Sequence, residues 1–122
     1  TLQERGLSNV EAITGDINTF DLGEEKLGTF DRVLSIEMFE HMKNYQKLIA
    51  KINGWLKPKG KLFVHIFVHK EHPYHFLPSD GWLAEHFFTG GIMASDDLLL
   101  YFQVSLDTLR HAYLMGGGIL SR

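Results

Sequence analysis

Two carboxylates and a histidine follow an apolar run in the stretch Phe30–Met42, which reads FDRVLSIEMFEHM. Glu37 and Glu40 are three residues apart, so both can face one pocket if the segment turns helically there. His41 follows directly, and histidine is the residue type best suited to proton transfer near neutral pH. Such a group is suited to general acid/base chemistry. Spacing alone leaves a second interpretation open, in which Glu37 caps the following helix while Glu40 and His41 are solvated.

Histidines form the second chemical feature. Five of them lie within residues 65–86: His65, His69, His72, His75 and His86. Imidazole is a common transition-metal ligand. However, no pair at i, i+4 brackets a carboxylate as in zinc-hydrolase motifs, so we favour substrate contacts and expect no metal ion. His65 lies within an apolar run, and a histidine in that position is more often a hydrogen-bonded core residue than a ligand.

Aromatic side chains accompany the histidines: Tyr74, Phe76, Trp82, Phe87 and Phe88. Most are expected to pack against one another, although a cationic amine would be attracted to the faces of such rings.

Asp16 is a third candidate, because it follows a short apolar segment and Gly15. Its carboxylate could accept a hydrogen bond from the amino group of a nucleotide base, or it could cap the next turn. Gly6, Gly15, Gly23 and Gly28 do not have the spacing of a glycine-rich phosphate loop.

The elements that would position these residues alternate between strand and helix. We predict strands over Val10–Ile13, Phe30–Ile36 and Lys61–Val68, and a helix from an Asn44 N-cap to Leu56. Lys57–Gly60 (KPKG) is predicted to be a turn, because proline cannot continue the helix. This order indicates a βαβ unit and an α/β fold, in which ligands bind at the carboxyl ends of the strands.

The segments outside this βαβ unit have weaker patterns. Leu2–Gly6 resembles the end of a helix, which suggests a fragment, and Asn18–Gly28 is a polar connection with room for a short helical turn. We predict a loop over 69–76, a short helix over 81–88, an apolar segment over 96–103, and no regular element over 115–122.

Composition restricts the function classes. The 122 residues, 44% of them hydrophobic, suffice for one domain or part of one, and the formal net charge of -3 without a basic stripe argues against a nucleic-acid partner. The absence of cysteine excludes a disulfide framework and a thiolate metal site. No apolar run reaches the ~20 residues of a membrane span. We therefore expect a cytoplasmic protein.

Four stretches, VEAITGDINTF, FDRVLSIEMFEHMKNY, LKPKGKLFVHIFVHKEHPYHF and FFTGGIMASDDLLLYFQ, follow one another in unbroken order. In this order the chain closely resembles the coclaurine N-methyltransferase group of plant benzylisoquinoline N-methyltransferases. These belong to the cyclopropane-fatty-acid-synthase-like class of enzymes that use S-adenosyl-L-methionine. The resemblance covers about Leu2–Gln103, and its most specific run is EMFEHMKNY.

The resemblance implies a partial Rossmann-like methyltransferase fold and a role for each matching residue. Glu37, Glu40 and His41 would be the acid/base group beside a small amine substrate, such as a tetrahydroisoquinoline alkaloid. The cofactor would lie against Asp16, Ile17, Ser35 and Ile36. The substrate pocket would include His65, Phe67 and Tyr74.

Two departures from the family qualify this reading. The glycine-rich cofactor loop should precede Leu2, and the resemblance is expected to end at Gln103. We therefore assign residues 1–103 to the C-terminal half of a methyltransferase domain and 104–122 to a divergent tail that its composition predicts to be poorly ordered. A homodimer is possible in the full-length parent. The alternatives are a cyclopropane-fatty-acyl-phospholipid synthase-like lipid enzyme and an inactive truncated product.

Overall fold

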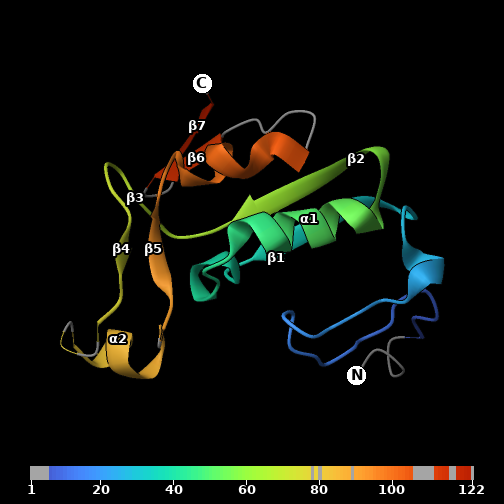
Figure 1. Ribbon diagram of the computed structural model, residues 1–122, viewed down its shortest axis with the longest axis horizontal. Helices are drawn as coiled ribbons and strands as arrows, with labels where there is room; N and C mark the ends of the chain where they lie inside the picture. Colours follow the sequence, from blue (N-terminus) through green and yellow to red (C-terminus); the bar gives the residue numbers. More distant parts are fainter. Residues whose placement is uncertain are drawn as a thin grey trace.

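The computed structural model describes residues 6–77, 79, 81–88, 90–105, 112–115 and 118–121. Its centre is a βαβ unit: strand β1 (Phe30–Ile36), helix α1 (Tyr45–Trp55) and strand β2 (Leu56–His65). The two strands pair in parallel, with Leu34 opposite Phe63 and Ile36 opposite His65. Figure 1 shows α1 lying along this pair of strands. The prediction of an α/β, partly Rossmann-like fold is confirmed.

Helix α1 begins where the sequence predicts. The side chain of Asn44 accepts a hydrogen bond from the backbone N–H of Lys47 at 3.0 Å, which satisfies one of the free donors of the first turn. Apolar residues at three- and four-residue steps then form one buried face: Tyr45, Leu48, Ile49, Ile52 and Trp55. Together with Phe39 and Leu56 they form the hydrophobic core.

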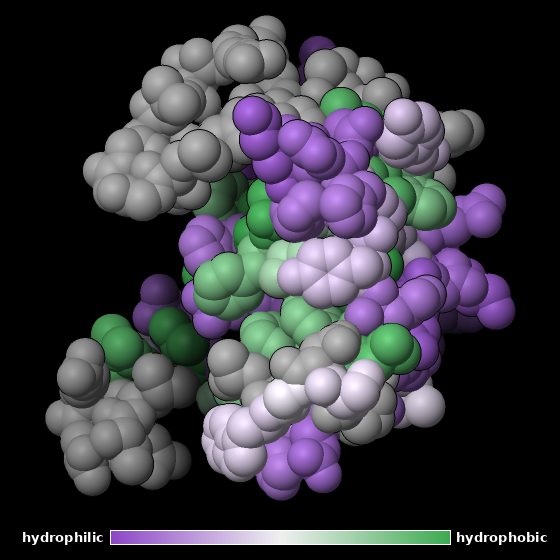
Figure 2. All heavy atoms as spheres, turned by 90° about the vertical axis from the view of Figure 1, so that its left-hand side faces the viewer, coloured by the Kyte–Doolittle hydropathy of each residue, from purple (hydrophilic) through white to green (hydrophobic). Residues whose placement is uncertain are grey.

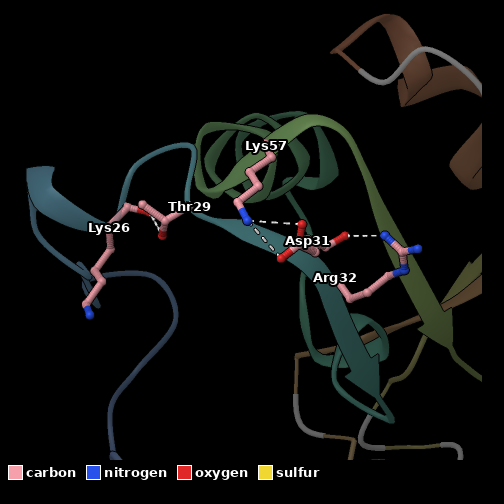
Figure 3. A network of polar contacts seen from close by, with 5 residues as sticks. All are labelled: Lys26, Thr29, Asp31, Arg32 and Lys57. Atoms are coloured by element: carbon pink, nitrogen blue, oxygen red, sulfur yellow. Dashed lines mark hydrogen bonds and ion pairs between the residues drawn. The ribbon is translucent and has the colours of Figure 1, made fainter.

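The predicted turn at Lys57–Gly60 is present, but as a bulge within β2. Phe30 pairs with Leu56 and Arg32 already pairs with Lys61, so the intervening residues of β2 loop out, and Lys59 adopts a positive φ of 67°. The Nζ atom of Lys57 donates to both carboxylate oxygens of Asp31, at 3.1 and 2.9 Å (Figure 3). This hydrogen-bonded ammonium lowers the pKa of Asp31.

One face of the β1–β2 pair packs against α1 and the other is open. Val33, Leu62 and Val64 pack against the core. On the opposite face Leu34 and Ile36 are 66% and 64% exposed, and Phe63 is 51% exposed. Successive strand side chains point to opposite faces, so this division follows directly from the alternation.

A second, three-stranded sheet follows β2, where a strand through Val68 and then a loop were expected. Strand β2 ends at His65, and β3 (Val68–His69) and β4 (Tyr74–His75) both pair with β5 (Ile92–Ser95). The predicted loop is therefore wrong at the positions that form β3 and β4, because β5, far along the chain, supplies their hydrogen-bond partners. The predicted helix is shorter than expected, α2 (Trp82–His86).

The N-terminal segment contains no strand over Val10–Ile13, so that prediction is wrong. No described segment pairs with these residues, and both Val10 and Ile13 are exposed. A strand requires a hydrogen-bonded neighbour, which the apolar pattern alone cannot supply. The polar connection does contain a short 3₁₀ turn, η1 (Glu24–Lys26). The predicted helix end at Leu2–Gly6 lies almost wholly outside the described residues.

After β5 the chain forms a 3₁₀ helix, η4 (Leu98–Ser105), and then a hairpin. Strands β6 (Ala112–Met115) and β7 (Gly118–Ser121) pair antiparallel, with Tyr113 opposite Leu120. The expectation of no regular element over 115–122 is therefore wrong for the residues of β7, whose backbone groups pair across the hairpin. Within the described part of the chain, no helix is long and apolar enough to cross a membrane.

Candidate active site at the ends of the parallel strands

The carboxyl ends of β1 and β2 bring Glu37 and His65 together. The backbone N–H of Glu37 donates to the carbonyl of His65 at 2.9 Å, which continues the strand pairing by one residue. Oε1 of Glu37 lies 3.9 Å from Nδ1 of His65, too far for a hydrogen bond, and this nitrogen has no hydrogen-bond partner among the described residues. Glu37 also adopts a positive φ of 49°, a conformation that residues other than glycine seldom take.

Glu40 lies on the 3₁₀ turn η2 (Phe39–His41) and is buried, with 1% of its surface exposed. Its Oε2 atom has no hydrogen-bond partner among the described residues. A buried carboxylate without a donor is costly, so such a group points to a catalytic or ligand-binding role. The turn is fixed from behind by Gly91, because a Cβ atom there would overlap the backbone carbonyl of Glu40.

Tyr45, the first residue of α1, is buried beside the same turn. Its ring stacks on Phe39 with centroids 5.8 Å apart, and burial, with a smaller effect of the Glu40 charge, raises the pKa of Tyr45 to about 12. Its hydroxyl also lacks a partner within the described residues. Helical periodicity predicts Tyr45 as a core residue of the helix but does not reveal that it lies close to Glu40.

His41 is exposed and joins an aromatic cluster, which we define as His41, Phe67, Phe76, Phe87 and Phe88. The His41 ring stacks on Phe88 with centroids 5.8 Å apart and meets Phe87 edge-on at 6.0 Å. Phe88 also stacks on Phe76 at 4.5 Å and contacts Phe67 edge-on at 6.4 Å. The cluster therefore links a predicted catalytic residue, His41, to a predicted pocket residue, Phe67.

Tyr74, the third predicted pocket residue, extends the cluster along β4. Its ring meets Phe76 edge-on at 5.7 Å and His69 at 5.8 Å. Figure 2 views the molecule from the side of β3–β5, where hydrophobic and near-neutral surfaces lie between hydrophilic ones. Phe76 and Phe88 connect the predicted residues. Both belong to the aromatic set that we expected mainly to pack together and, in part, to attract a cationic amine.

The histidines of this region do not form a metal site in the described residues, where no three His, Asp or Glu side chains gather in a suitable group. His69 and His72 have ring centroids 4.3 Å apart. Nδ1 of His69 accepts hydrogen bonds from the backbone N–H groups of Glu71 and His72, both at 3.2 Å, so this nitrogen stabilises the local turn.

Ser35 and Ile36, predicted to border the cofactor together, point to opposite faces of the sheet. Ser35 is buried on the α1 side, and its hydroxyl has no partner in the part of the chain that the structure describes. Ile36 is 64% exposed, on the same face as His65. A ligand at the strand ends can therefore contact the backbone of both residues but only one of the two side chains.

Asp16 and Ile17 lie on a tight turn beside α1. Oδ1 of Asp16 accepts from the backbone N–H and the side-chain amide of Asn18, at 2.9 and 2.8 Å, and its carbonyl accepts from the N–H of Phe20 at 2.7 Å. The capping role considered for Asp16 is therefore present. The described bonds use Oδ1, and the Asp16 residue is exposed. Ile17 is partly buried against the core.

The predicted residues thus form two groups. Glu37, Glu40, His41, His65 and Phe67 gather around the strand ends and the aromatic cluster, to which Tyr74 is joined through Phe76. Asp16 and Ile17 belong to the N-terminal segment, whose turn lies beside the first half of α1. Ile17 and Asn18 line a pocket there together with Met42, Asn44, Lys47, Leu48 and Lys51.

Comparisons with known proteins identify relatives of the chain. Residues 1–64 match the family described as "Methyltransferase domain". The chain is 41% identical over 118 residues to (S)-coclaurine N-methyltransferase of Thalictrum flavum subsp. glaucum, which covers 93% of this chain and 32% of the relative. It is 38% identical over 114 residues to pavine N-methyltransferase of the same plant, covering 90% of this chain and 31% of the relative.

A more distant match is the cyclopropane-fatty-acyl-phospholipid synthase of Escherichia coli (strain K12), with 35% identity over 68 residues, 54% of this chain and 17% of the relative. The chain thus spans about a third of the length of the plant relatives. The match to the first plant relative is wider than Leu2–Gln103, so the resemblance extends past the limit we expected. The proposed domain boundary itself stays a prediction.

Among solved structures, a crystal structure of coclaurine N-methyltransferase bound to N-methylheliamine and SAH matches with a TM-score of 0.71 and 41% identity. The match covers 84% of this chain and 31% of that one. The resemblance expected from the sequence is confirmed. Since the family match extends over more than half of the residues, and the fold agrees with it, the chain belongs to the methyltransferase domain family.

Proposed function

We propose that the protein is an S-adenosylmethionine-dependent N-methyltransferase, and that its acceptor is a small secondary or tertiary amine such as a tetrahydroisoquinoline alkaloid. The observation that carries this proposal is the buried Glu40 carboxylate, which lacks a hydrogen-bond donor in the described residues and lies beside the ends of two parallel strands. The similarity to coclaurine and pavine N-methyltransferases supports the choice of an amine.

The chemistry asked of the chain is limited to proton handling and orientation. S-adenosylmethionine, when bound, supplies an electrophilic methyl group on a sulfonium. The attacking amine forms an N–C bond while the S–C bond breaks, and a secondary amine must then lose the proton it carried. Glu40, in a dry environment, and Glu37 beside His65 are the groups placed to accept it, and His41 can pass it towards solvent.

The aromatic cluster would form the wall of the amine site. Aromatic faces attract a cationic or partly cationic nitrogen, and the stacked rings of Phe76 and Phe88 hold such a face rigidly. Phe67 and Tyr74 contribute edges to the same wall. This arrangement would favour a flat, apolar amine over a strongly hydrated one.

The turn at Asp16 and Ile17 fits the adenine end of the cofactor. A carboxylate oxygen held at an exposed position can accept from the adenine amino group, and the partly buried Ile17 can contact the ring. The buried hydroxyl of Ser35 and the backbone of Ile36 would border the methionine end. We also propose a cytoplasmic location and a homodimer, the first supported by the absence of cysteine and the second by the resemblance alone.

The test is mass-spectrometric detection of methyl transfer by the natural gene product, with S-adenosylmethionine and a tetrahydroisoquinoline as substrates. We expect a product heavier by one methyl group, and the same incubation with unsaturated phospholipid is the control. Modification of lipid double bonds without amine methylation would overturn the proposal in favour of the lipid enzyme, a candidate that the synthase match supports.

A second measurement addresses the inactive alternative. We expect calorimetry to detect no S-adenosylmethionine binding by the 122 residues alone, because the resemblance places the glycine-rich loop before Leu2. Binding by these residues alone would show that the described turn and strand ends suffice.

A further inference from the structure

Lys51, in the middle of α1, donates hydrogen bonds to three backbone carbonyls of the N-terminal turn. Its Nζ atom donates to the carbonyls of Ile17 at 3.0 Å and Phe20 at 2.9 Å, and to that of Asn18 at 3.4 Å. The bonds to Ile17 and Phe20 are partly buried, and they join segments more than thirty residues apart in the chain. Bonds from a charged donor in a partly dry setting are stronger than neutral ones.

A second contact from the same helix face holds the same turn. Trp55 lies one helical turn after Lys51, and its ring meets Phe20 edge-on with centroids 6.3 Å apart. Phe20 in turn covers Gly15, where a Cβ atom would approach the Phe20 ring to 2.9 Å. Lys51 therefore fixes the backbone of the turn, while Trp55 fixes its apolar side chain.

The internal bonds of the turn do not by themselves set its position relative to the rest of the molecule. The bonds from Asp16 to Asn18, Thr19 and Phe20 are all local, within four residues of one another. Such bonds define the shape of a turn, whereas only contacts to another element define where that shape lies. Among the hydrogen bonds described for Ile17–Phe20, those that reach another element come from Lys51.

We infer that Lys51 is a positioning residue for cofactor binding, which holds the Asp16–Phe20 turn at the height on α1 where Asp16 and Ile17 can contact the adenine ring. This inference rests on the proposed function. In this proposal Lys51 itself contacts neither the cofactor nor the reacting atoms. Its positive charge is taken up by the three carbonyls, so it acts through the backbone of the turn.

The test compares Lys51→Met and Lys51→Arg in the natural gene product. We expect Lys51→Met to raise the KM for S-adenosylmethionine by about tenfold while kcat and the KM for the amine change by less than about twofold, because the strand-end site is untouched. Lys51→Arg, which keeps a charged donor, should restore most of the lost affinity. A matched control is Lys57→Met, which removes an exposed lysine that bonds to Asp31 and not to the turn.

Hydrogen exchange at the amides of Asn18, Thr19 and Phe20 gives a readout that does not depend on activity. We expect about tenfold faster exchange there in Lys51→Met and no change in Lys57→Met. Unchanged exchange, or equal losses in kcat and in the affinities for both substrates, would overturn the inference. If the wild-type protein binds no S-adenosylmethionine, yet exchange is still faster in Lys51→Met than in the wild type, the proposed function is overturned instead.

Discussion

Glu40 places a carboxylate in the interior with an oxygen that no described donor satisfies. We predict that Glu40→Gln lowers kcat by about 10²-fold, since a general base contributes on the order of 10²–10⁴ in rate. The free energy of unfolding should stay equal or rise by about 1 kcal/mol, because the neutral amide is less costly to bury than an unpaired carboxylate. Steady-state kinetics and urea unfolding measure the two effects.

The control is Glu11→Gln, which makes the same chemical change at an exposed position. It should alter neither kcat nor stability by a measurable amount. A loss of S-adenosylmethionine affinity as large as the loss of kcat in Glu40→Gln would contradict the acid/base role.

Burial of Tyr45 makes the stability of the folded protein depend on pH, and it sets the direction of that dependence. Its pKa is raised from 10.0 to about 12 in the folded protein, so the unfolded chain loses the hydroxyl proton first as the pH rises. This contribution to stability is fully present below pH 10 and is lost between pH 10 and 12, by up to about 3 kcal/mol.

Tyr45→Phe should remove this decline and, since the Tyr45 hydroxyl has no partner in the described region, should cost little stability at pH 8. Urea unfolding of both proteins at pH 8 and pH 11 checks it. An identical alkaline loss in the phenylalanine variant would show that other groups cause it.

At the scale of residues, the sequence was sufficient to select Glu37, Glu40 and His41 as a group, because titratable side chains at the end of an apolar strand are conspicuous. It was not sufficient to separate their environments. Whether Glu40 is buried and His41 stacked on Phe88 depends on β5 and on the segment after α2, which return to the strand ends from far along the chain. The contact of Lys51 with the N-terminal turn has the same long-range origin.

At the scale of elements, the close contact between β5 and η2 predicts a marked sensitivity at Gly91. A Cβ atom there would overlap the Glu40 carbonyl, which is backbone and cannot rotate away. We predict that Gly91→Ala lowers the free energy of unfolding by about 1–3 kcal/mol and reduces kcat, because η2 must shift to relieve the overlap. Thermal unfolding and steady-state kinetics measure both.

Gly54 is the matched control within α1. An alanine Cβ there would lie 3.8 Å from the side chain of Leu27, which is ordinary contact. Gly54→Ala should therefore raise stability by about 0.5–1 kcal/mol through helix propensity, without affecting kcat. Equal effects of the two substitutions would refute the special role of Gly91.

Elements with local signals were predictable and those that depend on distant pairing were not. Asn44 and the apolar steps of α1 are contained within one stretch of sequence, as are the apolar runs of β1 and β2. Strands β3 and β4 exist because β5 pairs with them, and Val10–Ile13 is not a strand because no described neighbour pairs with it. Apolar pattern measures the tendency to be buried, whereas a strand also needs a partner.

At the scale of the whole molecule, the β1–β2 pair has one covered face and one open face. This asymmetry predicts that substitutions at neighbouring residues change the free energy of unfolding by different amounts. Val33 packs against the core, whereas Leu34 is 66% exposed on the other face. In the 122-residue chain, Val33→Thr should lower the free energy of unfolding by about 1–2 kcal/mol, because it buries a hydroxyl in an apolar site.

Leu34→Thr keeps a residue with good strand propensity and removes only an exposed apolar side chain, so it should change stability by less than about 0.5 kcal/mol. Urea unfolding of the two variants measures the difference between the faces. A cost for Leu34→Thr as large as that for Val33→Thr would mean that the open face is covered in solution. The exposed side chains of Leu34, Ile36 and Phe63 form an apolar surface that self-association would bury. If the molecular mass measured by sedimentation is then lower for Leu34→Thr than for the unsubstituted chain, the cover is a second copy of the chain.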